Sequence, residues 1–259
     1  MKPLQEKTRT VVLSVAGLDP SGGAGVYSDI RTFAHFGLKG MAVPTSLTIQ
    51  NDNEFKKLEN VNEKLFTETL NYIFDSYKVA ALKIGLITET YHIDAVVDCI
   101  TRFKPSITVL DPIIGSSSGF NFWDKKLLTY AAEKLFPAVD IITPNYIEAV
   151  GILNALGEDT ANSDQKDVAK RLNNIFRTKV AVTGGDSSVN RKVTDVYYDG
   201  VNLETRAAEY LDVPRGLKHG TGCAFSAALT ANMCRGLDFA AACALAALFV
   251  ENRIKEACE

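Results

Sequence analysis

Several features are missing from this sequence of 259 residues, and each absence argues against a class of protein. None of the five cysteines forms a CxxC pair, which argues against a zinc site or a disulfide framework and favours reduced thiols in a cytoplasmic protein. Residues 1–10 are not an apolar signal segment, and no apolar run approaches the roughly 18 residues of a membrane span. A net charge of −3 without a basic cluster argues against nucleic acid as a partner, and against an anionic membrane. The GxxxxGK-S/T motif of P-loop enzymes is also absent.

What the sequence does contain is an alternation of short apolar runs with longer amphipathic ones, without a linker or a repeat. This alternation predicts βαβ units, and therefore one α/β domain (1–259) with a mostly parallel sheet and helices on both faces. The expected strands are 11–16, 41–49, 79–87, 107–114, 140–143 and 179–183, followed by a hairpin of 193–198 and 201–207 around Asp199-Gly200. The expected helices are 26–36, 62–77, 91–103, 124–136, 148–156, 163–176, 223–234 and 238–257.

Polar or glycine-rich loops follow most of the expected strands. They are 17–25, 50–53, 115–122, 143–148 and 184–188, and a further loop precedes Cys223. Ligands of open α/β sheets bind beyond the carboxyl ends of the strands, so we expect these loops to face one cleft.

The stretch 218–226 has the strongest chemical character in the chain. Gly220 and Gly222 flank Thr221, and Cys223 then opens an Ala/Leu-rich helix. Crowded backbone N–H groups at a helix start favour an anion, usually a phosphate. The same field predicts a lowered pKa for the Cys223 thiol. The alternative is that Cys223 is only a small residue packed at a helix start.

Candidate metal ligands lie at two other strand ends. Asp111, directly before Pro112, could help to bind Mg²⁺ through water, or could be a turn residue. Asn145 and Glu148 have the spacing of a capping box, and a cap can also hold a site rigid. Asp19 and Asp29 flank the glycine loop 22–25, where each could be a helix cap, a surface charge or a substrate ligand.

These motifs, taken together and in this order, resemble the hydroxymethylpyrimidine/phosphomethylpyrimidine kinase family within the ribokinase-like superfamily. The resemblance covers most of the chain. It is carried by AGLDPSGGAG at 16–25, Gln50-Asn51, Lys83-Ile84-Gly85, Asp111-Pro112, TPN at 143–145 with Glu148-Ala149, and HGTGC at 219–223. It implies a three-layer α/β/α sandwich without a separate lid domain, the use of ATP with Mg²⁺, and commonly a homodimer.

The resemblance also implies roles for particular residues. Gly220, Thr221 and Gly222 with Cys223 would form the anion hole, and Cys223 would be the catalytic base. The substrate pocket would be lined by Gly17, Asp29, Gln50, Leu86 and Ile113. The nucleotide would be bound by Asn145, Thr183, Gly185 and Lys218, and Mg²⁺ by Glu148 and Asp111.

The chain departs from the family pattern at Tyr27, where glutamine is common, and at Thr183, where a lysine usually precedes two glycines. The implied reaction is ATP-dependent phosphorylation of the hydroxymethyl group of 4-amino-5-hydroxymethyl-2-methylpyrimidine in thiamin biosynthesis. Whether the monophosphate is phosphorylated in turn stays open. The alternatives are a pyridoxal or pyridoxine (vitamin B6) kinase of the same fold, a non-catalytic nucleotide-binding regulator and, ranked last, a cysteine hydrolase.

Overall fold

A computed structural model describes residues 9–115, 119–184 and 191–258. Their strands form one sheet in the order β3-β2-β1-β4-β5-β6-β7-β8-β9. The strands from β2 to β7 pair in parallel, whereas β3, β8 and β9 pair antiparallel to their neighbours. The bounds are β1 Val11–Leu18, β2 Lys39–Gln50, β3 Phe55–Asn60, β4 Val79–Ile84, β5 Ile107–Leu110, β6 Ile141–Ile142, β7 Lys179–Val182, β8 Lys192–Tyr198 and β9 Leu203–Glu209.

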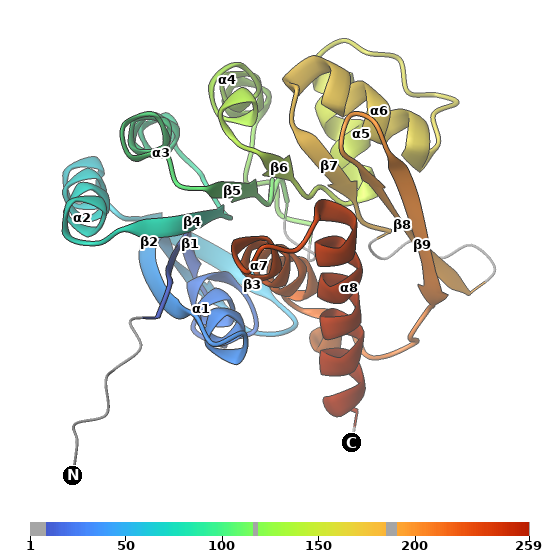
Figure 1. The fold of residues 1–259 in the computed structure, drawn as a ribbon, viewed down its shortest axis with the longest axis horizontal. Helices are drawn as coiled ribbons and strands as arrows, with labels where there is room; N and C mark the ends of the chain where they lie inside the picture. The colour runs from blue at the N-terminus through green and yellow to red at the C-terminus, as the bar shows by residue number, and fades with distance from the viewer. Residues whose placement is uncertain (1–8, 116–118, 185–190, 259) are drawn as a thin grey trace.

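Helices cover both faces of this sheet (Figure 1). On one face lie α2 (Glu63–Ser76), α3 (Thr90–Phe103), α4 (Lys125–Lys134), α5 (Tyr146–Ala155) and α6 (Gln165–Phe176), and on the other lie α1 (Gly25–His35), α7 (Thr221–Cys234) and α8 (Phe239–Glu256). Two 3-10 turns, η1 (Phe136–Ala138) and η2 (Arg215–Lys218), complete the described chain. The predicted α/β/α layers are therefore present.

The central strands are apolar on both sides because both faces are covered. On β1, for example, Leu13 packs into the core under α2–α6, whereas Val12 packs into the core on the α1 and α7 side. Neighbouring strand residues point to opposite faces, so a continuous apolar run can fill two cores.

Five helices begin at an Asn or Asp whose side chain accepts a backbone N–H bond of the first turn; these residues are Asn62, Asp124, Asn145, Asp164 and Asp238. Such caps satisfy donors that have no partner within the helix. Helix α7 differs. Its N-cap is Gly220 in the left-handed region (φ 75°), and no side chain caps it.

The structure corrects the predicted elements at two places. The sequence predicted a loop at 50–53 and a helix from 62, with no element between them, but residues 55–60 form β3, antiparallel to β2. The expected strands 79–87 and 107–114 end earlier, at Ile84 and Leu110. The residues beyond these ends leave the sheet and contribute to the cavity described below.

Within the described ranges, none of the helices has the length and apolar character that crossing a membrane requires. The cytoplasmic location stays a prediction.

Candidate active site

A cavity of about 740 Å³ lies at the carboxyl ends of the parallel strands. Residues at or beyond the carboxyl ends of six neighbouring strands line it, among them Gly17, Gln50, Leu86, Asp111, Asn145 and Thr183. The start of α7 closes it from the other side of the sheet, with Gly220, Thr221, Gly222 and Cys223 in its wall. The described parts of the expected strand-end loops thus line one cavity, whereas residues 116–118 and 185–188 of those loops lie outside the described residues.

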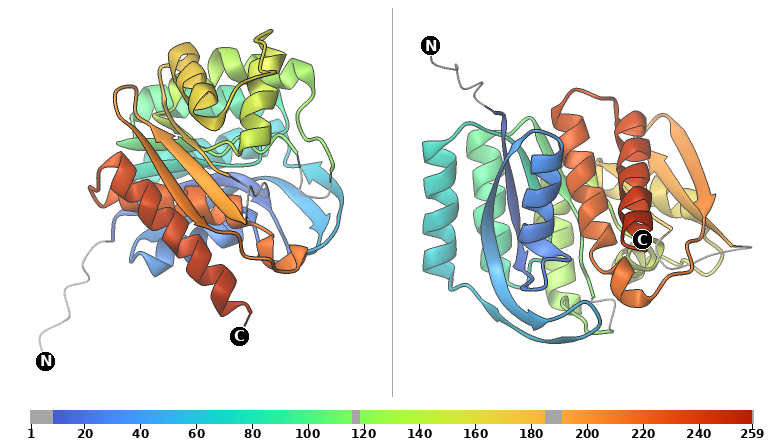
Figure 2. Two further views of the ribbon diagram at one scale, coloured as in Figure 1. Left: turned by 90° about the vertical axis from the view of Figure 1, so that its right-hand side faces the viewer. Right: turned by 90° about the horizontal axis from the view of Figure 1, so that it is seen from below.

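The N-terminus of α7 presents free donors to this cavity. The first bond within the helix runs from the N–H of Ala224 to the carbonyl oxygen of Gly220. The N–H groups of residues 221–223 precede that bond, so they have no acceptor within the helix. Residues 223–232 of α7 are buried between α1, α8 and the sheet (Figure 1 and Figure 2), and this buried body of the helix fixes the direction of the donors at its start. The arrangement can hold an anion.

The Cys223 thiol does not behave as the helix field alone predicts. Burial raises the pKa of Cys223 to about 12; the positive charge of Lys83 opposes this shift, and the negative charges of Asp111 and Asp29 add to it. The expected lowering of this pKa is therefore wrong for the free protein. Cys223 holds its proton at neutral pH, because the loss of solvation outweighs the partial charge of the helix start.

Two carboxyl groups, Asp111 and Glu148, line the same cavity. Asn145 and Glu148 form the capping box that the sequence indicates: each side chain accepts the other residue's N–H at 2.9 Å. Burial, followed by the negative charge of Asp111, raises the pKa of Glu148 to about 8. Asp111 is itself buried and accepts a hydrogen bond from Ser226 Oγ at 3.0 Å.

These two carboxyl groups suit a magnesium ion that also binds phosphates. Each disfavours the charge of the other, so a cation between them would be stabilising. Mg²⁺ commonly uses only one or two protein carboxylates, and completes its shell with water and substrate phosphates. Among the described residues, no group of three or more His, Cys, Asp or Glu side chains could hold a metal ion by itself.

The structure corrects the placement of Asp29. Its carboxylate does not line the cavity, because its side chain is fully buried and pairs with Lys83 Nζ at 3.0 Å. Ser14 Oγ also donates to it at 2.6 Å. Asp29 therefore belongs to a charge pair beneath the site, close enough for its charge to act on Cys223.

The remaining predicted residues that the structure describes also line the cavity. They include Gly17, Gln50, Leu86 and Ile113. Asn145 and Thr183 lie side by side through an isolated β-bridge, and Lys218, which also lines the cavity, donates to the Tyr210 hydroxyl at 2.6 Å. Gly185 lies outside the described residues. The roles of all these residues stay predictions.

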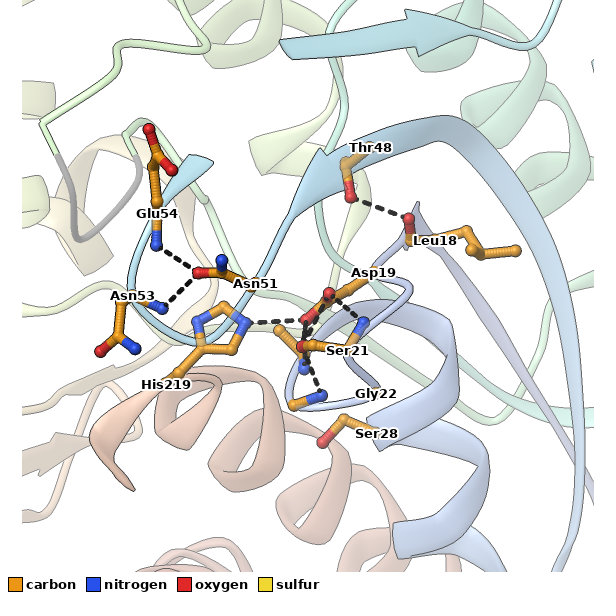
Figure 3. A network of polar contacts seen from close by, with 12 residues as sticks. Leu18, Asp19, Ser21, Gly22, Ser28, Thr48, Asn51, Asn53, Glu54 and His219 are labelled. Carbon is orange, nitrogen blue, oxygen red and sulfur yellow. Dashed lines mark hydrogen bonds and ion pairs between the residues drawn. The ribbon is translucent and has the colours of Figure 1, made fainter. Parts of the chain in front are cut away.

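Sequence reasoning assigned no role to His219 and left Asp19 ambiguous, yet the two side chains meet at the cavity (Figure 3). His219 Nε2 lies 2.7 Å from Asp19 Oδ2, although the residues are 200 positions apart. Asp19 lies in the motif at 16–25 and His219 in the motif at 219–223, the two most specific motifs of the chain. This was the only feature of the sequence that could have indicated a role for the pair.

Comparisons with known proteins agree with this geometry. A model of the phosphomethylpyrimidine kinase family matches residues 19–259. A hydroxymethylpyrimidine/phosphomethylpyrimidine kinase of Aquifex aeolicus is 33% identical, with 95% of this chain and 94% of that protein aligned. A pyridoxine kinase of Bacillus subtilis is 30% identical over 94% of this chain and 90% of its own length.

Solved structures give the same two groups. The crystal structure of phosphomethylpyrimidine kinase from Clostridium difficile has a TM-score of 0.80 at 26% identity, covering 95% of this chain and 100% of that one. Pyridoxal kinase from Staphylococcus aureus in complex with pyridoxal has a TM-score of 0.84 at 25% identity, covering 95% and 88%.

Proposed function

The chain belongs to the phosphomethylpyrimidine kinase family, and we propose that it transfers the γ-phosphoryl group of ATP to the hydroxymethyl group of 4-amino-5-hydroxymethyl-2-methylpyrimidine, a step of thiamin biosynthesis. The observation that carries this proposal is the uncapped N-terminus of α7. It presents the free N–H groups of 221–223 to a cavity that also contains Asp111 and Glu148. Backbone donors for a phosphate and carboxyl ligands for a cation thus line one cavity.

Phosphoryl transfer has a loose transition state that needs positioning and charge neutralisation more than covalent chemistry. The donors at 221–223 are fixed before the substrate arrives, because they belong to a helix packed on all sides. Preorganised donors of this kind stabilise developing charge without the cost of reorienting solvent. We assign the equatorial oxygens of the transferred group to them.

Asp111 and Glu148 would hold Mg²⁺, with Asn145 fixing the Glu148 side chain through the capping box. When bound, this ion supplies positive charge to the phosphates of the nucleotide. Thr183 and Lys218, which line the same cavity, would contact the nucleotide as well.

Cys223 would take the proton of the substrate hydroxyl. Its side chain lines the cavity directly at the anion site. Since burial raises the pKa of this thiol to about 12, the reactive thiolate is scarce at neutral pH in the free protein. A base with such a pKa gives a rate that rises with pH across the alkaline range.

A vitamin B6 kinase is the second candidate. The structural likeness to pyridoxal kinase, with a TM-score of 0.84, and the sequence likeness to a pyridoxine kinase favour it. The sequence departures at Tyr27 and Thr183 leave the choice of acceptor to experiment.

A coupled assay of ADP release tests both candidates with the pyrimidine alcohol, its monophosphate and pyridoxal as acceptors. We expect the highest kcat/KM with the pyrimidine alcohol. Cys223→Ala should lower turnover by about 100-fold or more and leave ADP binding intact. A higher kcat/KM with pyridoxal would establish the second candidate instead. Tight ADP binding without turnover on any acceptor would favour a regulator, and near-normal turnover of Cys223→Ala would disprove the assignment of the base.

We also propose that the protein is a homodimer. Leu47 and Ile49 on β2 are 53% and 52% exposed, on the strand face opposite to Thr48 and Gln50, which line the cavity. An apolar pair beside the edge strand β3 suits burial against a second copy. Sedimentation should give about twice the 28.2 kDa chain mass, and Leu47→Lys with Ile49→Lys should return it to one chain. A wild-type monomer would refute this.

A further inference from the structure

The glycine loop after β1 is built around one carboxylate. Asp19 is 1% exposed, and its oxygens accept hydrogen bonds from the N–H groups of Ser21 and Ala24 and from Ser21 Oγ, each at 2.9 Å. Figure 3 shows these bonds converging on the side chain. A carboxylate with this many donors holds the backbone of the loop in one conformation.

The loop before α7 packs against this first loop. A side chain at Gly220 would collide with the carbonyl oxygen of Gly23, and a side chain at Gly23 would collide with the ring of His219. The two backbones therefore lie in direct contact at the place where the anion site begins. Arg253 of α8 holds the same loop from a third direction, donating to the Gly23 oxygen and to Ser28 Oγ, each at 3.0 Å.

A side-chain bond between Asp19 Oδ2 and His219 Nε2 joins the two loops. His219 directly precedes Gly220, so its ring anchors the residue from which α7 starts. The other ring nitrogen, Nδ1, has no hydrogen-bond partner in the described part of the chain. The bond to Asp19 is thus the main polar constraint on this side chain.

We propose that His219 is a positioning residue: through its bond to Asp19 it holds the donors at 221–223 where the transferring phosphoryl group needs them. This inference rests on the proposed function of that site. Interactions made only with the phosphoryl group in the transition state change kcat more than they change substrate binding. Loss of His219, which positions the donors for this group, should therefore lower kcat. A shift of the donors by about 1 Å can cost about 100-fold in rate.

Two substitutions separate positioning from proton transfer. His219→Ala removes the bond, whereas glutamine places an amide nitrogen the same number of bonds from the backbone and can still donate to Asp19. We expect His219→Ala to lower kcat by about 100-fold, with the dissociation constant of ADP changed by less than about threefold. His219→Gln, which cannot carry a proton in this pH range, should recover kcat to within about tenfold of the wild type. His35→Ala, an exposed histidine of α1 away from the cavity, is the matched control.

The affinity for inorganic phosphate, measured by calorimetry on the same variants, needs no turnover. It should fall in His219→Ala and return in His219→Gln. Asp19→Asn should cost less in the His219→Ala background than alone, because the bond to His219 is then already lost and only the bonds to Ser21 and Ala24 remain to be weakened. Thermal unfolding shows whether each variant is folded.

Three results would overturn the inference: kcat and phosphate affinity of His219→Ala within about threefold of the wild type, His219→Gln as slow as His219→Ala, or loss of ADP binding in parallel with kcat. A wild type without turnover on any acceptor would refute the proposed function. The phosphate affinities would still decide the role of His219.

Discussion

Replacing Lys83 by methionine should lower the free energy of unfolding at pH 7 by about 3–5 kcal/mol, because it leaves a buried charge without its partner. Both side chains of the Lys83–Asp29 pair are fully buried, with 3.0 Å between nitrogen and oxygen. Although burial disfavours the charged amine, the negative charges around it, that of Asp29 above all, raise the pKa of Lys83 above its usual range. Without the ammonium, Ser14 Oγ is the only donor left to Asp29 among the described residues.

The loss of stability in Lys83→Met should depend on pH, because the Asp29 carboxyl is left buried without its partner. In Lys83→Met the pKa of Asp29 should lie above its unfolded value of about 3.9, since burial then acts without a counter-charge. Protonation stabilises the fold below such a raised pKa, so the deficit against the wild type should shrink as the pH falls from 7 toward 4. Adding Asp29→Asn removes the charge and should recover most of the stability at pH 7.

Urea denaturation followed by circular dichroism, at pH 7 and pH 5, measures both effects. Loss of the Lys83 charge also acts on Asp111 and Cys223, so the comparison of Lys83→Met with Lys83→Met/Asp29→Asn, both of which lack that charge, isolates the share of Asp29. A loss below about 1 kcal/mol at pH 7, the size of an ordinary substitution, would refute the reasoning. Equal losses at the two pH values would refute it as well.

Two further predictions concern stability. Burial lowers the pKa of His92 to about 4, so the stability that neutral His92 contributes should be fully present above about pH 6.5 and fall by about 3 kcal/mol between pH 6.5 and 4. In urea denaturation, the free energy of unfolding of His92→Phe should fall less over this range than that of the wild type. An equal fall would contradict this. Gly220→Ala should lower the melting temperature by several degrees, because φ is 75° and the new side chain would meet Gly23. Gly222→Ala is the control: its side chain would enter open space, so the melting temperature should not fall. Equal melting temperatures for the two variants would contradict the contact between the loops.

The layers could be predicted from the sequence because buried parallel strands and amphipathic helices leave strong patterns. Strand β3 could not. Its residues 55–60 include Lys56, Lys57 and Glu59, and it lies at the edge of the sheet. Edge strands often carry such charges, which prevent pairing with other chains, and so they resemble loops in a sequence.

The residues of the cavity could be found by motif, but their partners could not. Asp29 and Lys83 are 54 positions apart, and Asp19 and His219 are 200 apart. A pattern along the chain shows which strand end a residue follows, whereas a side-chain pair depends on how the loops approach in space. The sequence therefore indicated that Asp29 lies near the site but placed its side chain in the pocket. No pattern along the chain indicated the bond between Asp19 and His219.

Cys223 shows why local electrostatics alone misleads at such a site. The helix start favours a thiolate by a field that a sequence reveals, and this term is worth about 1 kcal/mol. Burial and the negative charges of Asp111 and Asp29 raise the pKa of the thiol instead. These effects can be recognised only in the folded structure, where α7 packs between α1, α8 and the sheet. Lys83, which is fully buried, then supplies the positive charge that limits the shift of this pKa. The pKa of the thiol is thus set first by burial and then by Lys83, Asp111 and Asp29, and the motifs alone showed neither the burial nor the pairing of Lys83 with Asp29.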